Sequence, residues 1–352
     1  MHTPDDGPDT GLLDRLASGP VICAEGYVFE LERRGYLQAG PFVPEVVLDH
    51  PEEVATLHRE FVHAGSDVVE ALTYYAHREK LRAVGKGDIL AELNHQALGI
   101  GREVATEAGA LLAGNICNTN IYDPADPATH EQARAMLAEQ VDWAAEAGVD
   151  YVIGETFRYA AEALVALEVI RAAGLTSVIT LAVGHSPQTR EGWELPEACR
   201  MLAGEGADVV GLNCMRGPAT MLPLLSGVTA AVDVPVAALP VPYRTHADEP
   251  TFQSLREPGD SLVPDGRPFP SALDPFTCNR YEIADFTHHA YEAGVRYLGL
   301  CCGAAPHHVR AMAEALGRLP AASRFSPDMS KHVFLGDDPV LSEHNRAYGD
   351  QL

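Results

Sequence analysis

The sequence predicts an α/β fold: a (β/α)8 barrel with a long loop after the seventh strand and a C-terminal extension. Three observations support this prediction: a repeated helix–glycine–strand phrase, strands that are almost wholly apolar, and helical periodicity between those strands. Parallel strands covered by helices on both faces are expected to be apolar without alternation. An open, doubly wound sheet is built from the same βα units and is the weaker alternative.

Six glycines mark the expected ends of helices. Each follows a helix-like segment and precedes an apolar run, as in EAGVDYVIGE and EAGVRYLGLC. Glycine in the left-handed conformation commonly closes a helix before a tight turn into a strand. Gly206 and Gly294 lie 88 residues apart, twice the 44 residues between Gly65 and Gly109, so we expect one further junction before Pro235. The full set is Gly65, Gly109, Gly148, Gly174, Gly206 and Gly294.

The six glycine junctions, the further junction before Pro235 and an opening strand without a preceding helix together predict eight strands. Between them, apolar residues recur at helical spacing, for example Val54, Leu57 and Phe61 at i, i+3 and i+7. The predicted strands are 21–25, 68–74, 111–116, 151–155, 178–183, 209–214, 236–239 and 297–301.

Two segments lie outside the repeat. Residues 244–274 are rich in proline, glycine and acidic residues, and they follow the seventh strand on the face where barrel enzymes have their active sites. We expect this segment to be a lid or a wall of the site. Residues 1–319 are predicted to form the barrel, and residues 320–352 a C-terminal tail or an oligomerisation arm, so a homo-oligomer is expected.

Composition excludes several classes of function. The chain has 25 Lys and Arg against 50 Asp and Glu, a net charge of −25, which argues against nucleic-acid binding. No stretch approaches the roughly 18 consecutive apolar residues of a membrane span, and the first residues are acidic rather than basic and then apolar, so a cytoplasmic protein is expected. Seven cysteines, an odd number that includes an adjacent pair, favour reduced thiols over structural disulfides.

Three of these cysteines fall at predicted strand ends. Cys214 ends the sixth strand in GLNCMRG, and Cys301 and Cys302 end the eighth in YLGLCCGAAP. All strand carboxyl ends meet at one face of a parallel barrel, and Gly303 permits the turn that would let both adjacent cysteines face the same point. Three thiolates around Zn²⁺ leave a fourth position open, as in catalytic zinc sites, and this ligand set favours a thiol substrate held as a nucleophilic thiolate.

Other interpretations of these cysteines stay open. Each could be a small buried apolar residue, and the adjacent pair could be the redox disulfide of a thiol oxidoreductase. The zinc could also be structural, with a fourth protein ligand, in a barrel that binds another protein without catalysis. His307, at the expected start of the last helix, could occupy the open zinc position, although a surface histidine is the alternative there.

The sequence resembles the homocysteine S-methyltransferase family, and within it the betaine-homocysteine branch. The resemblance covers residues 20 to 318 and lies in GLNC, CCG, AEGYVFELERRGYLQAGPFVPE and HREFVHAGSDVVEALTYYAHREKL. It implies a TIM barrel, zinc held by Cys214, Cys301 and Cys302, and homocysteine bound to that zinc through sulfur. It also implies that Glu155 in VIGETF binds the homocysteine amino group and that the backbone around Gly26 binds the α-carboxylate.

Several positions depart from the branch. It has Asp-Gly-Gly at the first strand where this chain has Ala-Glu-Gly, so Glu25 is the candidate replacement for the missing acid. Phe42 stands where the branch has Trp and Thr156 where it has Tyr, while Tyr75 is retained among the residues that bind betaine. A trimethylammonium group binds aromatic faces, so these changes bear on the methyl donor. Residues that could rebuild an aromatic site are Tyr27, Phe29, Tyr74 and Phe157.

The resemblance and the cysteines together predict a zinc-dependent S-methyltransferase with two small-molecule substrates. A betaine-like onium donor would give its methyl group to homocysteine, forming methionine. The alternatives are the same chemistry with a sulfonium or another N-methyl donor, and a non-catalytic barrel with structural zinc.

Overall fold

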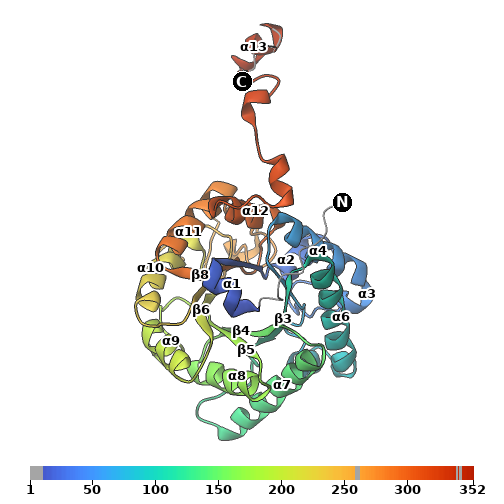
Figure 1. Cartoon of the computed structure of the whole chain (residues 1–352), viewed down its shortest axis with the longest axis vertical. Coiled ribbons are helices and arrows are strands. Elements are labelled where there is room, and N and C mark those ends of the chain that lie inside the picture. The colour runs from blue at the N-terminus through green and yellow to red at the C-terminus, as the bar shows by residue number, and fades with distance from the viewer. Residues whose placement is uncertain (1–10, 258–261, 338–339, 341–342) are drawn as a thin grey trace.

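The computed structural model describes residues 11–257, 262–337, 340 and 343–352, and its centre is a closed barrel of eight parallel strands (Figure 1). Each strand pairs with the next, and β1 closes the barrel on β8 with Val21 opposite Tyr297. The strands are β1 Val21–Ala24, β2 Val68–Glu70, β3 Leu111–Cys117, β4 Tyr151–Phe157, β5 Thr176–Leu181, β6 Val209–Asn213, β7 Val236–Leu239 and β8 Val295–Leu300. The predicted (β/α)8 barrel is confirmed, and the open-sheet alternative is wrong.

Helices surround the barrel and bury the apolar stripe that the sequence predicts. In α4, Val54, Leu57 and Phe61 are buried against the strands, and the helix ends at Gly65 with φ +116°. All six predicted helix-closing glycines have positive φ. The outer helices are α4 Pro51–Ala64, α6 Leu90–Ala108, α7 Pro127–Glu146, α8 Ala160–Ala172, α9 Leu195–Gly204, α10 Pro218–Thr229, α11 Arg280–Glu292 and α12 Pro306–Ala315. Short helices α2 Tyr27–Arg33, α3 Val46–Asp49 and α5 Arg78–Ala83 follow β1 and β2.

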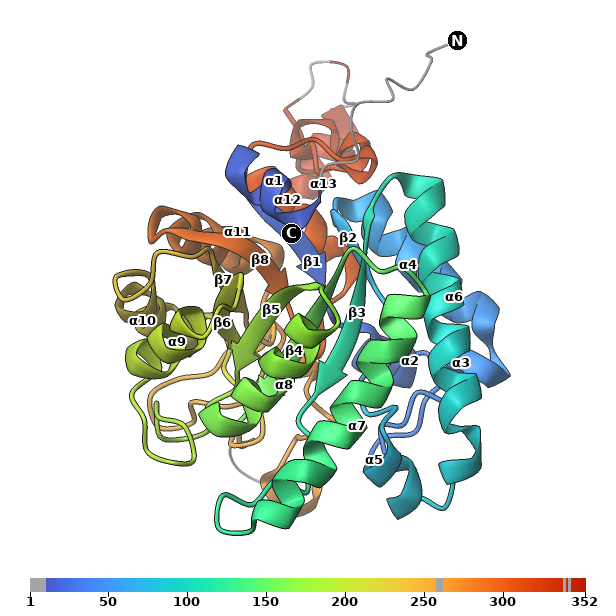
Figure 2. The same cartoon turned by 60° about the horizontal axis from the view of Figure 1, so that its bottom comes forward.

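The amino-terminal end of the barrel is filled. Leu12 and Leu16 of α1 (Leu12–Ser18) pack against the apolar residues of the barrel interior, and the hydroxyls of Tyr151 and Tyr297 are hydrogen-bonded to each other at 2.9 Å. Figure 2 shows α1 at one end of the barrel and the segment between β7 and α11 at the other. Side chains that bind a ligand therefore belong to the carboxyl end.

The segment between β7 and α11 forms part of a wall at this carboxyl end. It includes the short helices Pro264–Gly266 and Asp274–Phe276, and Phe252 and Phe269 from this segment line a cavity described below. Beyond α12, the chain continues through Ala321–Phe325 and Met329–Lys331 to α13 (Glu343–Gly349), which projects away from the barrel in Figure 1. Among the described residues, no helix has the length and apolar character to cross a membrane.

Candidate active site

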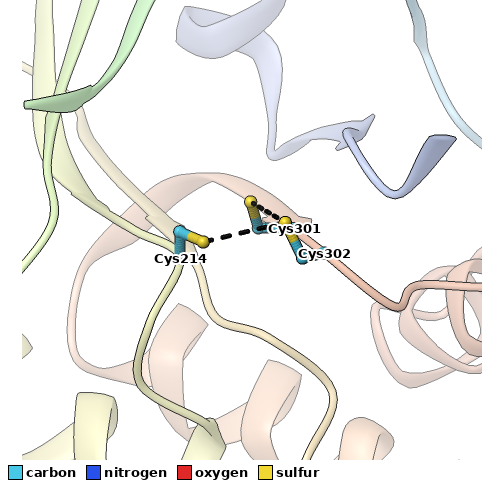
Figure 3. A group of neighbouring side chains, drawn as sticks. All are labelled: Cys214, Cys301 and Cys302. Carbon is cyan, nitrogen blue, oxygen red and sulfur yellow. Dashed lines mark hydrogen bonds between the residues drawn. The ribbon is translucent and has the colours of Figure 1, made fainter. Parts of the chain in front are cut away.

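Cys214, Cys301 and Cys302 come together at the carboxyl end of the barrel (Figure 3). Cys214 follows β6 directly, and Cys301 and Cys302 follow β8. The Sγ of Cys302 lies 3.8 Å from the Sγ of Cys214 and 3.8 Å from that of Cys301, and all three sulfurs lie within 4.8 Å of one another. Residues that are 87 positions apart in the sequence thus form one sulfur cluster.

Backbone contacts with the end of β7 hold the two cysteine segments together. The N–H of Cys214 donates to the carbonyl of Leu239 at 2.9 Å, and the N–H of Cys301 donates to the next carbonyl, that of Pro240, also at 2.9 Å. Cys214 has φ +55°, a conformation uncommon for a residue with a side chain, and the chain turns at Gly303 with φ +95°. These turns bring all three thiols to the same point.

The cluster fits a zinc ion. Zn–S bonds of about 2.3 Å in a tetrahedron place sulfur atoms about 3.8 Å apart, which is the separation found here. Hydrogen bonds with the Cys301 and Cys302 thiols lower the pKa of Cys214 below its usual value. The three-cysteine group contains no histidine among the described residues, and carboxylate oxygens of Glu25 and Glu155 lie within 4.8 Å of the Cys301 sulfur. His307 lines a separate surface cavity with His308 and Arg33.

A small acidic cavity of about 20 Å³ adjoins Cys301 and Cys302. Its lining includes the carboxylates of Glu25, Glu70 and Glu155, all of which are buried. Both carboxylate oxygens of Glu25 and Oε2 of Glu70 are buried without a hydrogen-bond partner. We call this space the acidic cavity.

Two asparagines position the carboxylates of the acidic cavity. Asn115 on β3 donates to Glu70 and, at 2.7 Å, to Glu155. Asn213, the residue before Cys214, donates to the other oxygen of Glu155 at 2.6 Å. Burial raises the pKa of Glu155 to about 7, and burial and the charge of Glu155 raise the pKa of Glu25 and Glu70 above their usual values. A cation in this cavity would relieve the repulsion between the carboxylates.

A larger cavity of about 240 Å³ adjoins Cys214 and Cys302. We call it the aromatic cavity, because eight aromatic residues line it. Phe29 and Phe42 stack with ring centroids 5.2 Å apart, and the Lys80 ammonium lies 4.3 Å from the ring centroid of Tyr75. The aromatic lining is Phe29, Phe42, Tyr74, Tyr75, Tyr122, Tyr159, Phe252 and Phe269.

Unusual backbone conformations concentrate around the aromatic cavity. Of the seven described non-glycine residues with positive φ, six line it: Phe42, Tyr75, Asn120, Thr156, Cys214 and Met215. Such conformations are costly and cluster at functional sites, where the surrounding structure maintains them. The strain therefore marks the same region as the cysteines.

The structure divides the predicted site residues between the two cavities. Glu25, Tyr27 and Glu155 line the acidic cavity, while Phe42, Tyr75 and Thr156 line the aromatic cavity. Tyr27 thus lies on the acidic side, where its ring packs against His58 and Phe61.

Gly26 has a packing role, because a Cβ there would overlap Ala304. Phe157, a candidate for the aromatic site, is fully buried and lines neither cavity. Sequence reasoning missed Glu70, Asn115 and Asn213. Their common signal is a polar side chain within an otherwise apolar strand.

Comparison with known proteins agrees with this geometry. A model of the homocysteine S-methyltransferase family matches residues 22–316. The betaine-homocysteine S-methyltransferase 1 of Danio rerio is 37% identical over 90% of this chain and 79% of its own length. The S-methylmethionine-homocysteine S-methyltransferase BHMT2 of Mus musculus is 33% identical over 97% of this chain and 92% of its own length.

The fold is also that of a solved structure. The metallated homocysteine methyltransferase MmuM of Escherichia coli superposes with a TM-score of 0.64 at 19% identity, over 84% of this chain and 96% of that chain. The family match spans the whole barrel, including the three cysteines, both cavities and the segment between β7 and α11. The chain therefore belongs to the homocysteine S-methyltransferase family and is an S-methyltransferase with homocysteine as its methyl acceptor.

Proposed function

We propose that the chain transfers a methyl group from a small onium donor, such as a betaine, to homocysteine bound through its sulfur at Cys214, Cys301 and Cys302, giving methionine. The observation that carries this proposal is the place of Cys302, which lines both cavities. A substrate sulfur at the cysteine cluster would have the acidic cavity on the side of Cys301 and the aromatic cavity on the side of Cys214.

The acidic cavity suits the amino group of homocysteine. Its volume of about 20 Å³ admits a group of the size of one ammonium, and its carboxylate oxygens without partners would accept hydrogen bonds from that group. Asn115 and Asn213 fix the carboxylate of Glu155 from two sides, so it is oriented before the substrate binds. We assign Glu155, Glu25 and Glu70 to this role.

The cysteine cluster suits activation of the acceptor thiol. A zinc ion held by Cys214, Cys301 and Cys302 would supply an ionised substrate thiolate at neutral pH, where a free thiol is only a few per cent ionised. The transfer then needs no general base from the chain, because the attacking sulfur carries no proton. What the chain adds is alignment of the sulfur with the donor's methyl carbon.

The aromatic cavity suits the donor. The faces of Phe and Tyr rings attract a methylated cation, each by about 0.5–2 kcal/mol. The two relatives are named for different donors, betaine and S-methylmethionine. Because Phe and Thr stand at positions 42 and 156, the donor of this chain is an onium compound that fits a cavity whose aromatic residues are phenylalanine and tyrosine.

The test is methionine formation from homocysteine by the zinc-loaded protein, with glycine betaine and S-methylmethionine as donors. Cys214→Ala should lose both bound zinc and activity. Cys199→Ala is the matched control, because Cys199 is a buried free cysteine of α9, outside both cavities. Full activity of metal-free protein would contradict the proposal, and a reversible Cys301–Cys302 disulfide with metal-free activity would favour the oxidoreductase interpretation.

A further inference from the structure

Arg216 is a buried arginine that lies two residues after Cys214. It is 6% exposed, and its guanidinium donates to the carbonyls of Gly184 at 2.8 Å, His185 at 2.9 Å and Thr220 at 3.4 Å. Its Nε is buried without a hydrogen-bond partner, and burial lowers the pKa of the side chain. In the described part of the chain, its guanidinium pairs with no carboxylate and bonds to carbonyl oxygens. Burying a charge without an opposite charge is costly, so we expect this residue to have a role.

The turn just before Arg216 is strained. Cys214 and Met215 have φ +55° and +54°, and two consecutive left-handed residues with side chains persist only where the surrounding structure holds them. On the side of β7, the N–H of Val241 donates to the carbonyl of Arg216 at 3.0 Å. The N–H of Phe252 donates to the carbonyl of Met215 at 2.9 Å. On the side of β5, the guanidinium of Arg216 supplies the hydrogen bonds, to the segment that follows this strand.

A guanidinium suits this position, because its planar fork donates in several fixed directions. Nη2 reaches the segment after β5, and Nη1 reaches the first turn of α10. One side chain thereby joins two neighbouring segments to the turn that carries Cys214. Arg216 lines neither the acidic cavity nor the aromatic cavity, so it lies outside both proposed substrate sites.

We propose that Arg216 is a positioning residue for the cysteine cluster. It holds the turn at residues 214 and 215, so that the sulfur of Cys214 stays 3.8 Å from the sulfur of Cys302. The side chain acts on the metal through Cys214 and touches neither substrate. This inference rests on the proposed function, because it assigns Arg216 a part in holding the zinc ion of that proposal.

The test compares Arg216→Met and Arg216→Lys with a matched control. Arg216→Met should weaken zinc binding, measured in competition with a chelator, by about 10- to 100-fold, as changes behind metal ligands do. With Co²⁺ in place of zinc, its thiolate-to-cobalt absorption should fall, because one of three sulfurs leaves the ion. Arg216→Lys should recover part of both losses, since an ammonium can donate to some of the same carbonyls. The control is Arg102→Met on α6: Arg102 also donates to carbonyls, those of Ala147 and Gly148, and should change neither value.

A measurement without metal separates this inference from the proposed function. In a crystal structure of metal-free Arg216→Met, the sulfur of Cys214 should lie more than 4.8 Å from that of Cys302, beyond the limit that encloses all three sulfurs here. An unmoved Cys214 or an unchanged zinc affinity would overturn the inference, as would an equal loss of zinc in Arg102→Met. If both Arg216 variants fail to fold, the residue supports the barrel as a whole, and the inference is wrong. If the unaltered chain does not methylate homocysteine but Cys214 moves in Arg216→Met, the proposed function fails and this inference stands.

Discussion

The phenol of Tyr243 fills the space that a side chain at Gly303 would need. Gly303 follows the cysteine pair with φ +95°, and Arg33 ties the two residues together by donating to the Tyr243 hydroxyl at 2.9 Å and to the Gly303 carbonyl at 3.3 Å. The turn that directs Cys302 towards Cys214 therefore depends on the absence of a Cβ at this position. It also depends on Tyr243, which lines neither the acidic cavity nor the aromatic cavity.

We predict that Gly303→Ala loses zinc. The new methyl group would overlap the Tyr243 ring, so either the ring or the cysteine turn must move. Gly85→Ala is the control: Gly85 also has positive φ, at +73°, but has open space around it, so only about 1 kcal/mol of backbone strain is expected. Zinc per chain, measured by elemental analysis of both folded variants, decides the matter. A full zinc content in Gly303→Ala would mean that the turn is not required.

We predict that Glu70→Gln raises the KM for homocysteine by about tenfold or more and changes the KM for the donor little. The amide keeps the shape of the side chain but removes one of the charges assigned to the substrate ammonium, and a charge-assisted hydrogen bond contributes roughly 1.5–3 kcal/mol. The comparison substrate is 4-mercaptobutyrate, which is homocysteine without its amino group. The variant should discriminate less between the two thiols than the unaltered protein. Unchanged discrimination would place the ammonium elsewhere.

The barrel and its cysteine cluster are predictable from sequence because both follow from where strands end. Glycine closes six of the outer helices, the apolar run fixes the strand, and the carboxyl ends of parallel strands meet at one face. Glu70 is not predictable in this way. The apolar pattern predicts a strand over 68–74, but β2 ends at Glu70. The turns at Tyr75 and Cys214 and the irregularity of β4 at Thr156 use positive φ without glycine, so no residue type predicts them.

We predict that His58 makes the fold less stable in acid. His58 is buried against Tyr27, neither ring nitrogen has a hydrogen-bond partner, and burial lowers its pKa to about 3. The unfolded chain takes up a proton below pH ~6.5, whereas the folded chain does not, so stability falls as the pH drops from ~6.5 towards 3.

His58→Phe should remove about 2 kcal/mol of the stability loss between pH 7 and pH 5, measured by urea unfolding at both values. His63→Phe, at an exposed position on α4 with no ion pair in the described part of the chain, is the control for the substitution itself. The buried glutamates are the same in all three proteins and cancel in the difference. An identical pH dependence in His58→Phe and the unaltered chain would show that His58 takes up its proton at the same pH in the folded and unfolded states.

The last prediction concerns the C-terminal segment. Of the thirteen large apolar side chains that are exposed in the described part of the chain, eight lie between Leu319 and Leu352. A projecting segment with this many exposed apolar residues gains stability by packing against another chain. A second copy of the same chain is always present in solution and can serve as that partner. We therefore predict a homo-oligomer held together by this segment.

A chain ended after Ser326 should be a monomer by light scattering and keep its melting temperature. This end point retains the turn Ala321–Phe325, which packs on α4, and the hydrogen bond from Ser326 to Glu314. Leu335→Asp in the full chain tests the same surface without removing residues, because a charge there would have to be buried on association. If both proteins keep the oligomeric state of the unaltered chain, the contact between chains lies on the barrel. The exposed apolar residues of the segment then need another explanation.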